Sequence, residues 1–538
     1  MTIASRVVER LFHLPAPVTR VVRVHRAIPV TARDGVVLRT DHWEPRLRPA
    51  PTILIRTPYG RAGVMGLISG RLLAERGYHV VLQSCRGTFD SGGEFDPMRH
   101  ERADGLDTVA WIERQPWFDG NLFTYGPSYV GFTQWAIAAD AGPVLKGMLT
   151  AVTASGLRDP TYAGGAYSLA NVLNWVTITS NQGGSLLSFM YKQNRVQARL
   201  RRAWTHLPLS EVDGVVTGRQ IRFFQEWLKH AEPGDPYWEQ RGNPDIAGVR
   251  APVCMVGGWY DMFLPWQLRD YATLCAAGAA PRLVIGPWDH ADPRLLGVQM
   301  REGMAWFRAA LDGGTAGGVR VHIGGRDEWR ELPRWPPDAR TTEWFFQAGA
   351  GLAPAAPDDA GPDRFRYDPA DPTPSPGGPL LTRDAGRVDN RAVEARSDVL
   401  VYTSAPLAAD LEAIGPVSAL VQVRTSAEFF DVFARVCEVT PDGRSENICD
   451  GLVRVSPGMF PPDADGVRPV EVELWPMGYV FGRGHRIRVQ LAGAAHPRYA
   501  RHTGTGEPLG SAARLSPVDY EVYHDRRHPS ALRLPLTG

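Results

Sequence analysis

The sequence carries almost no net charge and almost no lysine. Lysine and arginine together number 59 and aspartate and glutamate 58, which gives a formal net charge of +1 at pH 7. Three of the basic residues are lysines, and the arginines are spread along the chain rather than grouped. Proteins that bind nucleic acid usually carry a clustered basic surface. We therefore expect no nucleic-acid partner.

Cysteine is scarce, and its spacing is irregular. The five cysteines are scattered and include no Cys-x-x-Cys pair: Cys85, Cys254, Cys275, Cys437 and Cys449. An odd number of cysteines in a chain of 538 residues does not favour a disulfide framework. We expect buried free thiols and a reducing, cytoplasmic compartment.

Long apolar runs are missing as well. The first twenty residues lack the continuous apolar segment of a signal peptide. No stretch approaches the ~20 consecutive apolar residues that a helix needs to cross a bilayer. The sequence therefore predicts no membrane partner.

In the first 150 residues, apolar runs alternate with helical stretches. Residues 51–56 and 78–83 are typical of strands buried on both faces. Residues 64–76 and 104–114 have the spacing of helices. Such alternation indicates a mostly parallel sheet with helices on both faces, so we assign residues 1–150 to the first part of an α/β domain.

The pattern changes twice further along the chain. Residues 151–247 contain helices and loops without clear strands, which indicates an inserted helical cap, with the best helices at 185–204 and 217–230. Strand-like runs return in residues 248–345, the second part of the α/β domain. In residues 346–538, apolar and polar residues alternate, as in the antiparallel strands of a β-sandwich.

The most informative stretch is Tyr125-Gly126-Pro127-Ser128-Tyr129-Val130-Gly131. A short apolar run precedes it and a helical run follows it. A Gly-x-Ser turn between a strand and a helix is the nucleophile elbow of an α/β-hydrolase, in which a strained turn lifts the serine Oγ above the sheet. The usual motif is Gly-x-Ser-x-Gly, and here the second glycine comes one residue late. We interpret Ser128 as a nucleophile, flanked by glycines where a Cβ would obstruct the approach of helix to strand.

A serine hydroxyl needs a base to accept its proton and an acid to orient that base. In α/β-hydrolases the acid and the histidine come later in the chain than the serine. Asp261 follows the predicted strand 252–258, and His290 follows the predicted strand 282–286, so both fall at strand ends, where open parallel sheets place their sites. Asp289 is the alternative acid, but a carboxylate next to His290 in sequence reaches Nδ1 poorly. We predict a triad of Ser128, Asp261 and His290.

Two hydrogen-bond donors are expected for the oxyanion. The N–H of Tyr129 lies at the start of the predicted helix. The second donor usually follows an early strand, where this chain has Thr57-Pro58-Tyr59-Gly60. The phenol of Tyr59 is chemically adequate, and the alternative is that Tyr59 is an ordinary turn residue.

Together these motifs resemble the cocaine esterase-like (CocE/NonD) hydrolases, relatives of the X-Pro dipeptidyl-peptidases and α-amino acid ester hydrolases. The likeness extends to residues 86–95, 482–488 and 497–506. In that family the elbow commonly reads Gly-x-Ser-Tyr-x-Gly, which agrees with the late glycine. His502 departs from the family, because relatives often carry asparagine there.

The resemblance implies an α/β-hydrolase domain, a helical cap and a C-terminal jelly-roll β-sandwich. It also implies Ser128 as nucleophile, Asp261 as orienting acid and His290 as base. The implied oxyanion hole is the Tyr59 hydroxyl and the Tyr129 N–H.

Trp175 and Phe263 look like positions that in relatives shape an aromatic acyl pocket, and the alternative for each is core packing. Aromatic walls would favour a hydrophobic acyl group. The leading hypothesis is therefore a serine esterase that works through an acyl-enzyme. An X-Pro dipeptidyl-peptidase or an acylase acting on α-amino acid esters or β-lactam side chains would need carboxylates for a substrate ammonium. The cap offers Asp159 and Glu211 for that purpose.

A third hypothesis, from another class, is a carbohydrate-binding protein whose hydrolase part is an inactive scaffold. The expected partner is a small-molecule ester or amide, and a homo-oligomer is left open. The histidines and acidic residues show no His-Glu-x-x-His or comparable spacing, so we expect no metal and no other cofactor.

Overall fold

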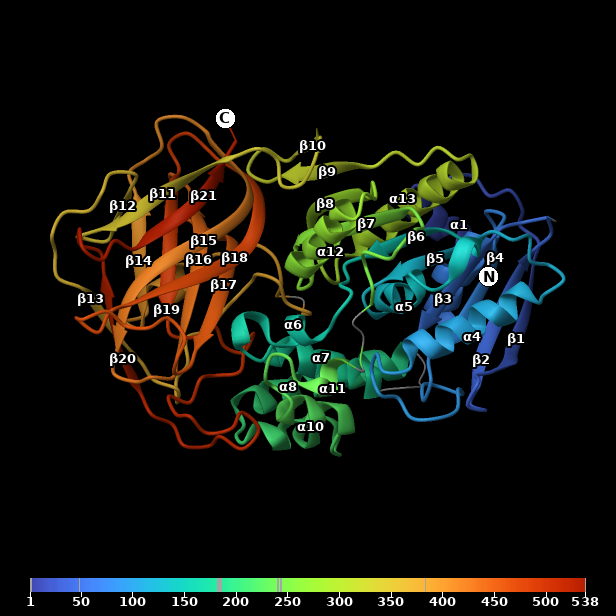
Figure 1. The fold of residues 1–538 in the computed structure, drawn as a ribbon, viewed down its shortest axis with the longest axis horizontal. Helices are drawn as coiled ribbons and strands as arrows, with labels where there is room; N and C mark the ends of the chain where they lie inside the picture. The colour runs from blue at the N-terminus through green and yellow to red at the C-terminus, as the bar shows by residue number, and fades with distance from the viewer. Residues whose placement is uncertain are drawn as a thin grey trace.

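A sheet of ten strands organises the first 332 residues (Figure 1). The computed structural model describes residues 2–47, 49–180, 186–239, 241, 244–382 and 384–537, without the side chains of residues 2 and 186–195. The strand order is β1-β2-β4-β3-β5-β6-β7-β8-β9-β10, parallel from β4 to β9 and antiparallel at both edges. The strands are β1 (Val22–Thr31), β2 (Val37–Pro45), β3 (Thr52–Thr57), β4 (His79–Ser84), β5 (Leu122–Pro127), β6 (Leu145–Ala151), β7 (Val253–Tyr260), β8 (Arg282–Asp289), β9 (Gly318–Ile323) and β10 (Glu328–Leu332).

Helices cover both faces of this sheet because its inner strands are apolar on both sides. In β3, Ile53 and Ile55 pack with one helix layer, whereas Leu54 packs with the other. The first layer holds α1 (Thr2–Leu11), the continuous helical segment α2 (Gly63–Met65), η1 (Gly66–Arg71) and α3 (Leu72–Ala74), and α13 (Pro293–Leu311). The second layer holds α4 (Glu101–Glu113), α5 (Tyr129–Ala138) and α12 (Leu264–Ala276).

The helices and strands of this domain that were not predicted from the sequence include α1, β6, α12, α13 and β10. Helix α1 carries an apolar stripe, but Ile3, Val7 and Leu11 in that stripe are exposed and do not pack on the sheet. One of its contacts with the domain is polar, since the buried Ser5 hydroxyl donates to the Glu75 carboxylate at 3.1 Å.

The cap leaves the sheet after β6 and returns at β7. Its elements are α6 (Arg158–Thr161), η3 (Ala163–Gly165), α7 (Leu169–Ser180), α8 (Leu186–Thr205), η4 (Leu209–Glu211), α9 (Val212–Thr217), α10 (Arg222–Lys229) and α11 (Pro236–Glu239). Helix α8 matches the prediction for 185–204, of which Ser185 lies outside the described residues. The predicted helix 217–230 starts too early: Gly218, with φ of 82°, ends α9, and α10 begins at Arg222.

The C-terminal region forms a second sheet of eleven strands that folds into a jelly-roll sandwich. Its elements are β11 (Arg340–Gln347), β12 (Gly351–Ala353), β13 (Asp363–Tyr367), α14 (Arg391–Glu394), β14 (Val399–Ser404), β15 (Leu411–Thr425), β16 (Phe430–Val439), β17 (Ser445–Val455), β18 (Arg468–Phe481), β19 (Arg486–Ala492), β20 (Val518–Tyr523) and β21 (Ala531–Leu536). The expected division at residues 345 and 346 falls inside β11, which already pairs with β21. An α/β-hydrolase domain, a helical cap and a β-sandwich thus follow one another, the fold class expected from the sequence.

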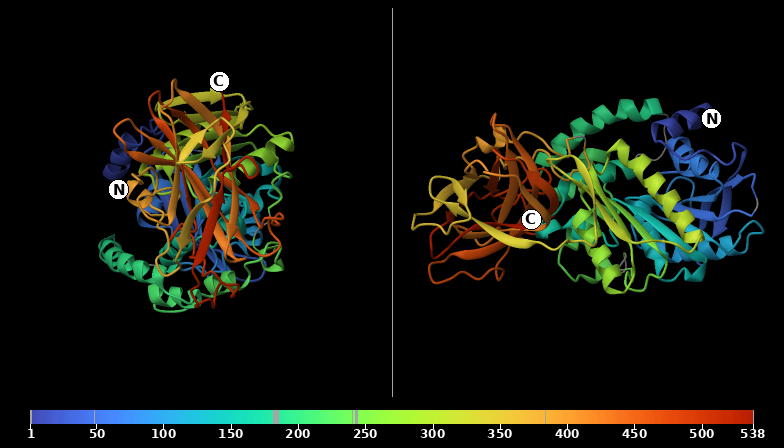
Figure 2. Two further views of the ribbon diagram at one scale, coloured as in Figure 1. Left: turned by 90° about the vertical axis from the view of Figure 1, so that its left-hand side faces the viewer. Right: turned by 90° about the horizontal axis from the view of Figure 1, so that it is seen from above.

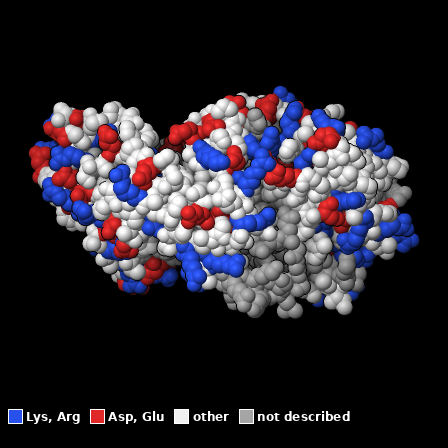
Figure 3. Space-filling model, turned by 90° about the horizontal axis from the view of Figure 1, so that it is seen from below, with Lys and Arg blue, Asp and Glu red and all other residues white. Residues whose placement is uncertain are grey.

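The sandwich lies at one end of the molecule, beside the hydrolase domain (Figure 2). A β-bridge between Gly324 and Tyr479 joins the end of β9 to β18. The cap helices lie along one side of both units in Figure 1. On the face shown in Figure 3, positive and negative side chains are interspersed, in keeping with the near-zero net charge. None of the helices in the described part of the chain is both long and apolar enough to cross a bilayer.

Candidate active site

Ser128 occupies a strained turn between β5 and α5. Its φ of 55° and ψ of −130° lie in a region that non-glycine residues rarely adopt. Such a conformation costs on the order of 1–3 kcal/mol and persists only where the surroundings impose it. Here the Ser128 N–H donates to the Ala151 carbonyl at 2.9 Å, and the Thr153 hydroxyl donates to the Ser128 carbonyl at 2.7 Å. The loop after β6 therefore holds the turn in place.

The late glycine of the elbow has a steric cause. A Cβ on Gly131 would lie 2.4 Å from the Thr153 side chain. A Cβ on Gly126 would lie 2.3 Å from the side chain of Val130, which occupies the position of the usual second glycine. Each glycine is required by a close approach of the helix, as the sequence predicted.

The structure brings together the three residues predicted as a triad. The Ser128 Oγ lies 3.0 Å from His290 Nε2, and His290 Nδ1 lies 2.6 Å from Asp261 Oδ2. Asp261 is fully buried, and its other oxygen accepts the Phe263 N–H at 2.8 Å. Asp289, the alternative acid, instead accepts the Ala291 N–H. With three residues from the ends of β5, β7 and β8, a proton path runs from the serine to the histidine.

Tyr59 and Tyr129 flank the serine from two elements. The Tyr59 hydroxyl, just after β3, accepts the Trp175 indole N–H at 3.0 Å, and Ser128 is among the side chains that influence its pKa. Burial raises the pKa of Tyr59 to about 12, so its phenol keeps its proton and stays a donor. The Tyr129 N–H lies in the first turn of α5, where no carbonyl of the helix can accept it. Both groups can donate to an oxygen beside Ser128.

The Tyr129 side chain fixes that helix start from below. Its hydroxyl donates to the Glu101 carboxylate and accepts the Met98 N–H, both at 2.8 Å. Glu101 in turn forms an ion pair with the buried Arg56 at 2.8 Å. Burial, followed by the negative charge of Glu101, raises the pKa of the Tyr129 phenol far above its usual value. The ring and the N–H of Tyr129 are therefore held by a charged network beneath the elbow.

A cavity of about 50 Å³ opens at Ser128 and His290 between the hydrolase domain and the cap. Trp175 and Phe263, the predicted pocket residues, both line it. The apolar part of the wall includes Met98, Phe132, Ala154, Leu157, Pro160, Val172, Trp175, Trp227, Met262, Phe263 and Leu381. Among the described lining residues there is no aspartate, glutamate, lysine or arginine. The cavity therefore suits an uncharged group.

The two cap carboxylates considered for a substrate ammonium do not line this cavity. Asp159 forms an ion pair with Arg269 at 2.7 Å, and Glu211 bonds His206 at 2.8 Å. Both carboxylates are substantially exposed and already have partners.

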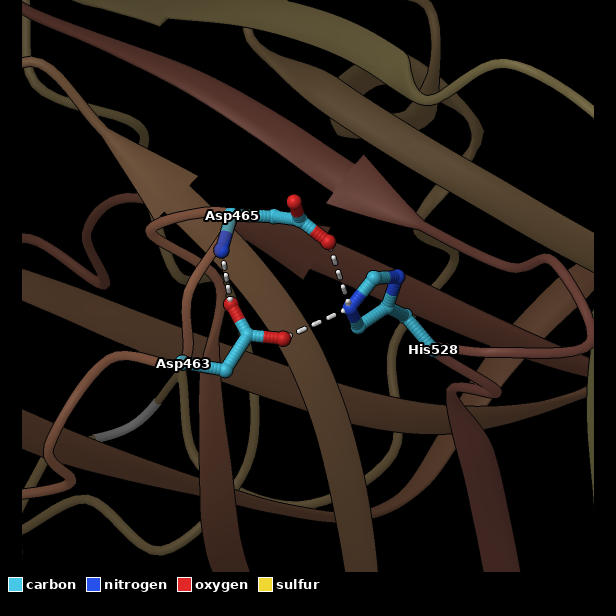
Figure 4. A group of neighbouring side chains, drawn as sticks. All are labelled: Asp463, Asp465 and His528. Atoms are coloured by element: carbon cyan, nitrogen blue, oxygen red, sulfur yellow. Dashed lines mark hydrogen bonds and ion pairs between the residues drawn. The ribbon is translucent and has the colours of Figure 1, made fainter.

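All five cysteines are free thiols. Four are buried, but Cys275 is exposed, so the expectation of burial is wrong for this one. One group of His and Asp side chains in the described part of the chain has metal-type spacing: Asp463, Asp465 and His528, on two loops of the sandwich (Figure 4). His528 Nε2 lies 2.8 Å from Asp463 Oδ2, the distance of an ion-paired hydrogen bond.

Several residues at the site carried no signal in the sequence. Thr153, Trp227 and Leu381 reach it from the β6 loop, the cap and the loop before α14. Glu101 does not line the cavity but accepts a hydrogen bond from the Tyr129 hydroxyl. Their roles depend on neighbours that are distant in sequence, which no spacing rule reports.

Comparisons with known proteins agree with this geometry. Residues 34–292 match the X-Pro dipeptidyl-peptidase (S15 family) domain, and residues 309–533 match the X-Pro dipeptidyl-peptidase C-terminal non-catalytic domain. The chain is 31% identical to the cocaine esterase of Rhodococcus sp. (strain MB1 Bresler), over 94% of this chain and 97% of that protein.

Two solved structures share the fold over nearly the whole chain. An aminopeptidase from a marine sediment Thaumarchaeota archaeon has a TM-score of 0.81 at 21% identity, with 97% of each chain covered. An α-amino acid ester hydrolase has a TM-score of 0.78 at 21% identity, covering 97% of this chain and 98% of that one. The match to cocaine esterase supports the enzyme hypotheses and not the carbohydrate-binding one. The chain belongs to the S15 family of X-Pro dipeptidyl-peptidase-like serine hydrolases, alongside cocaine esterase.

Proposed function

We propose that the protein is a serine esterase that cleaves carboxylic esters with an uncharged, hydrophobic acyl group. The observation that carries this proposal is the hydrogen-bonded line from Asp261 through His290 to Ser128, which ends at a cavity without charged side chains in its described wall. Ester hydrolysis at such a line needs no group beyond the chain itself and water.

In the first half of the reaction, the Ser128 Oγ attacks the ester carbonyl while His290 Nε2 accepts the hydroxyl proton. Asp261 keeps Nδ1–H directed at its own carboxylate and stabilises the imidazolium. The oxyanion is stabilised by donation from the Tyr59 hydroxyl and the Tyr129 N–H. His290 then gives its proton to the leaving alcohol, and an acyl-enzyme remains.

In the second half, water attacks the acyl carbon with His290 as base, and Ser128 is released with the acid product. During both halves of the reaction, the acyl group lies in the cavity against Trp175 and Phe263. Apolar walls with few polar groups favour hydrophobic acyl groups. The small volume of the cavity favours short or flat acyl groups.

A dipeptidyl-peptidase or α-amino acid ester hydrolase is the second candidate, because the chain matches the S15 family. Such substrates present a free ammonium, which needs a carboxylate or several acceptors once desolvated. The described wall of the cavity offers no carboxylate. This argues for the esterase. Turnover of Ala-Pro-p-nitroanilide and of p-nitrophenyl esters at matched concentrations separates the two candidates.

The deciding experiment uses a fluorophosphonate probe together with p-nitrophenyl acetate and benzoate. The wild-type protein should be labelled once, at Ser128, and lose turnover in proportion to labelling. Ser128→Ala should take no label and lose turnover by about 10⁶-fold. Undiminished hydrolysis by that variant would refute the proposal.

We also infer a reducing compartment such as the cytoplasm for this enzyme. The five unpaired thiols support it, since exposed Cys275 would be open to oxidation elsewhere. A thiol titration of freshly purified protein under denaturing conditions, without reductant, should find all five. Sedimentation analysis would determine the oligomeric state.

A further inference from the structure

The indole nitrogen of Trp175 makes a hydrogen bond whose direction is fixed. Trp175 Nε1 lies 3.0 Å from the Tyr59 hydroxyl oxygen. An indole N–H can donate but cannot accept. Tyr59 therefore accepts this bond, and its own hydroxyl proton must point to another partner. Ser128 is the other side chain with a hydroxyl that influences the Tyr59 phenol.

The same reasoning applies at the opposite end of the site. An ionised Asp261 carboxylate can accept but cannot donate. With a neutral His290, the single ring proton on Nδ1 goes to Asp261, so Nε2 accepts the Ser128 proton. Trp175 donates to Tyr59, which leaves the Tyr59 proton to be directed at an oxygen beside Ser128. In this arrangement the serine proton already points at the base.

We propose that Trp175 is a positioning residue for catalysis, and not only a wall of the acyl cavity. By occupying one lone pair of the Tyr59 oxygen, it directs the Tyr59 O–H toward the place where the oxyanion forms. This inference rests on the proposed esterase function and adds a specific role to it. When Ser128 attacks, the Tyr59 O–H donates to the new oxyanion, while the Trp175 bond stays in place.

The surroundings of Trp175 support such a role because they prevent the indole from turning away. Its ring stacks on Trp227, with centroids 5.9 Å apart and planes 5° apart. On another side it stacks on Tyr129, at 5.8 Å and 18°. The ring centroids of Phe95 and Phe223 lie 6.1 and 5.4 Å from that of Trp175. A ring held by four aromatic neighbours delivers its N–H in one direction.

The bond also makes the Tyr59 hydroxyl a better donor. Accepting a hydrogen bond polarises an O–H group, so that it donates more strongly in a chain than alone. The indole N–H opposes the rise in the pKa of Tyr59 that burial causes, which is the same effect on the phenol proton. The increase in donor strength matters most in the transition state, when the negative charge has formed.

A double-mutant cycle separates this role from a wall function. Tyr59→Phe removes the oxyanion donor, Trp175→Phe removes the N–H but keeps an aromatic ring, and the double variant removes both. Leu381→Ala is the matched control, because Leu381 lines the same cavity but is not one of the four aromatic neighbours that hold the Trp175 ring. All variants are assayed with p-nitrophenyl acetate and p-nitrophenyl benzoate, after titration of active sites with fluorophosphonate.

We expect Trp175→Phe to lower kcat by roughly 5- to 10-fold, the scale of one hydrogen bond. The loss should be equal for acetate and benzoate. In the Tyr59→Phe background, the same substitution should change kcat less than twofold, because no hydroxyl remains to be directed. Leu381→Ala should instead act mainly on KM for benzoate, and its effect should be unchanged by Tyr59→Phe.

A loss that differs between the two acyl groups and persists in the Tyr59→Phe background would overturn the inference. That result would leave Trp175 as a wall residue and the esterase intact. A wild-type protein that neither takes the probe nor hydrolyses either ester would refute the proposed function itself. The two failures are therefore distinguishable.

Discussion

The indole nitrogen of Trp475 lies 3.0 Å from the main-chain oxygen of Asp261. Trp475 belongs to β18 of the sandwich, whereas Asp261 follows β7 of the hydrolase sheet. The sandwich thus holds the loop that carries the triad carboxylate. Since a 1 Å displacement of a catalytic group can cost orders of magnitude in rate, the C-terminal unit is part of the site's rigidity.

Trp475→Phe should therefore slow ester hydrolysis without removing the triad. We expect kcat to fall by roughly 3- to 10-fold from loss of one hydrogen bond, with little change in KM. Trp329→Phe, at a more exposed tryptophan of β10, is the control and should leave both unchanged. Steady-state kinetics on p-nitrophenyl acetate make the test. An unaltered kcat for Trp475→Phe would mean that the loop is held without the sandwich.

Asp261→Asn should lower kcat by about 10⁴-fold, because an amide favours the wrong histidine tautomer. The matched control is Asp289→Asn, which changes the carboxylate adjacent to His290 in sequence. Asp289 contacts the Ala291 N–H and not the imidazole, so this variant should lose less than threefold. Equal losses in the two variants would contradict the assignment of Asp261 as the acid.

Gly131→Ala should destabilise the elbow. Its Cβ would sit 2.4 Å from Thr153, so helix or loop must shift, at a cost of about 1–3 kcal/mol. Gly214→Ala in α9 meets nothing within 4 Å and should not lower the melting temperature. Thermal melts and probe labelling of the two variants are compared. If Gly131→Ala melts and reacts like the wild type, the steric account of the late glycine fails.

His502→Asn should make the protein more resistant to acid. Burial lowers the pKa of His502 to about 4, below the ordinary value of 6.5. The neutral ring therefore stabilises the fold above pH 6.5, and this stabilisation is lost as the pH falls from 6.5 to 4. The shift corresponds to about 3 kcal/mol. Asparagine does not titrate in this range and can accept the Gly504 N–H, as His502 Nδ1 does at 2.9 Å.

The measurement for this prediction is the melting temperature between pH 7 and pH 4. The curve of His502→Asn should fall less steeply than that of the wild type. His13→Asn, at an exposed histidine, is the control and should follow the wild type. Parallel curves for all three proteins would show that His502 does not titrate with unfolding.

Much of the fold could be predicted because its signals are local. Buried parallel strands are continuous apolar runs, and β3, β4, β5, β7 and β8 lie where such runs occur. For other features a local pattern was not enough. Helix α1 exposes much of its apolar stripe, and the division between α9 and α10 depends on one left-handed glycine.

The candidate triad could also be predicted from the sequence. A serine in an elbow and two polar residues at strand ends must meet at one edge of a parallel sheet, whatever lies between them. The environment of the cavity was not readable. Trp227 and Leu381 reach it from the cap and from the region beyond residue 346, and no pattern relates them to Ser128.

By itself, then, the sequence determined the layered architecture and the candidates for the triad, because apolar periodicity and strand ends are read from local stretches of chain. The tertiary structure decided the rest. It placed His290 against Asp261 and not against Asp289, joined Trp475 to the acid loop and placed the indole of Trp175 on Tyr59. Those contacts join segments more than a hundred residues apart or turn one side chain away from its neighbour, and only packing in three dimensions specifies them.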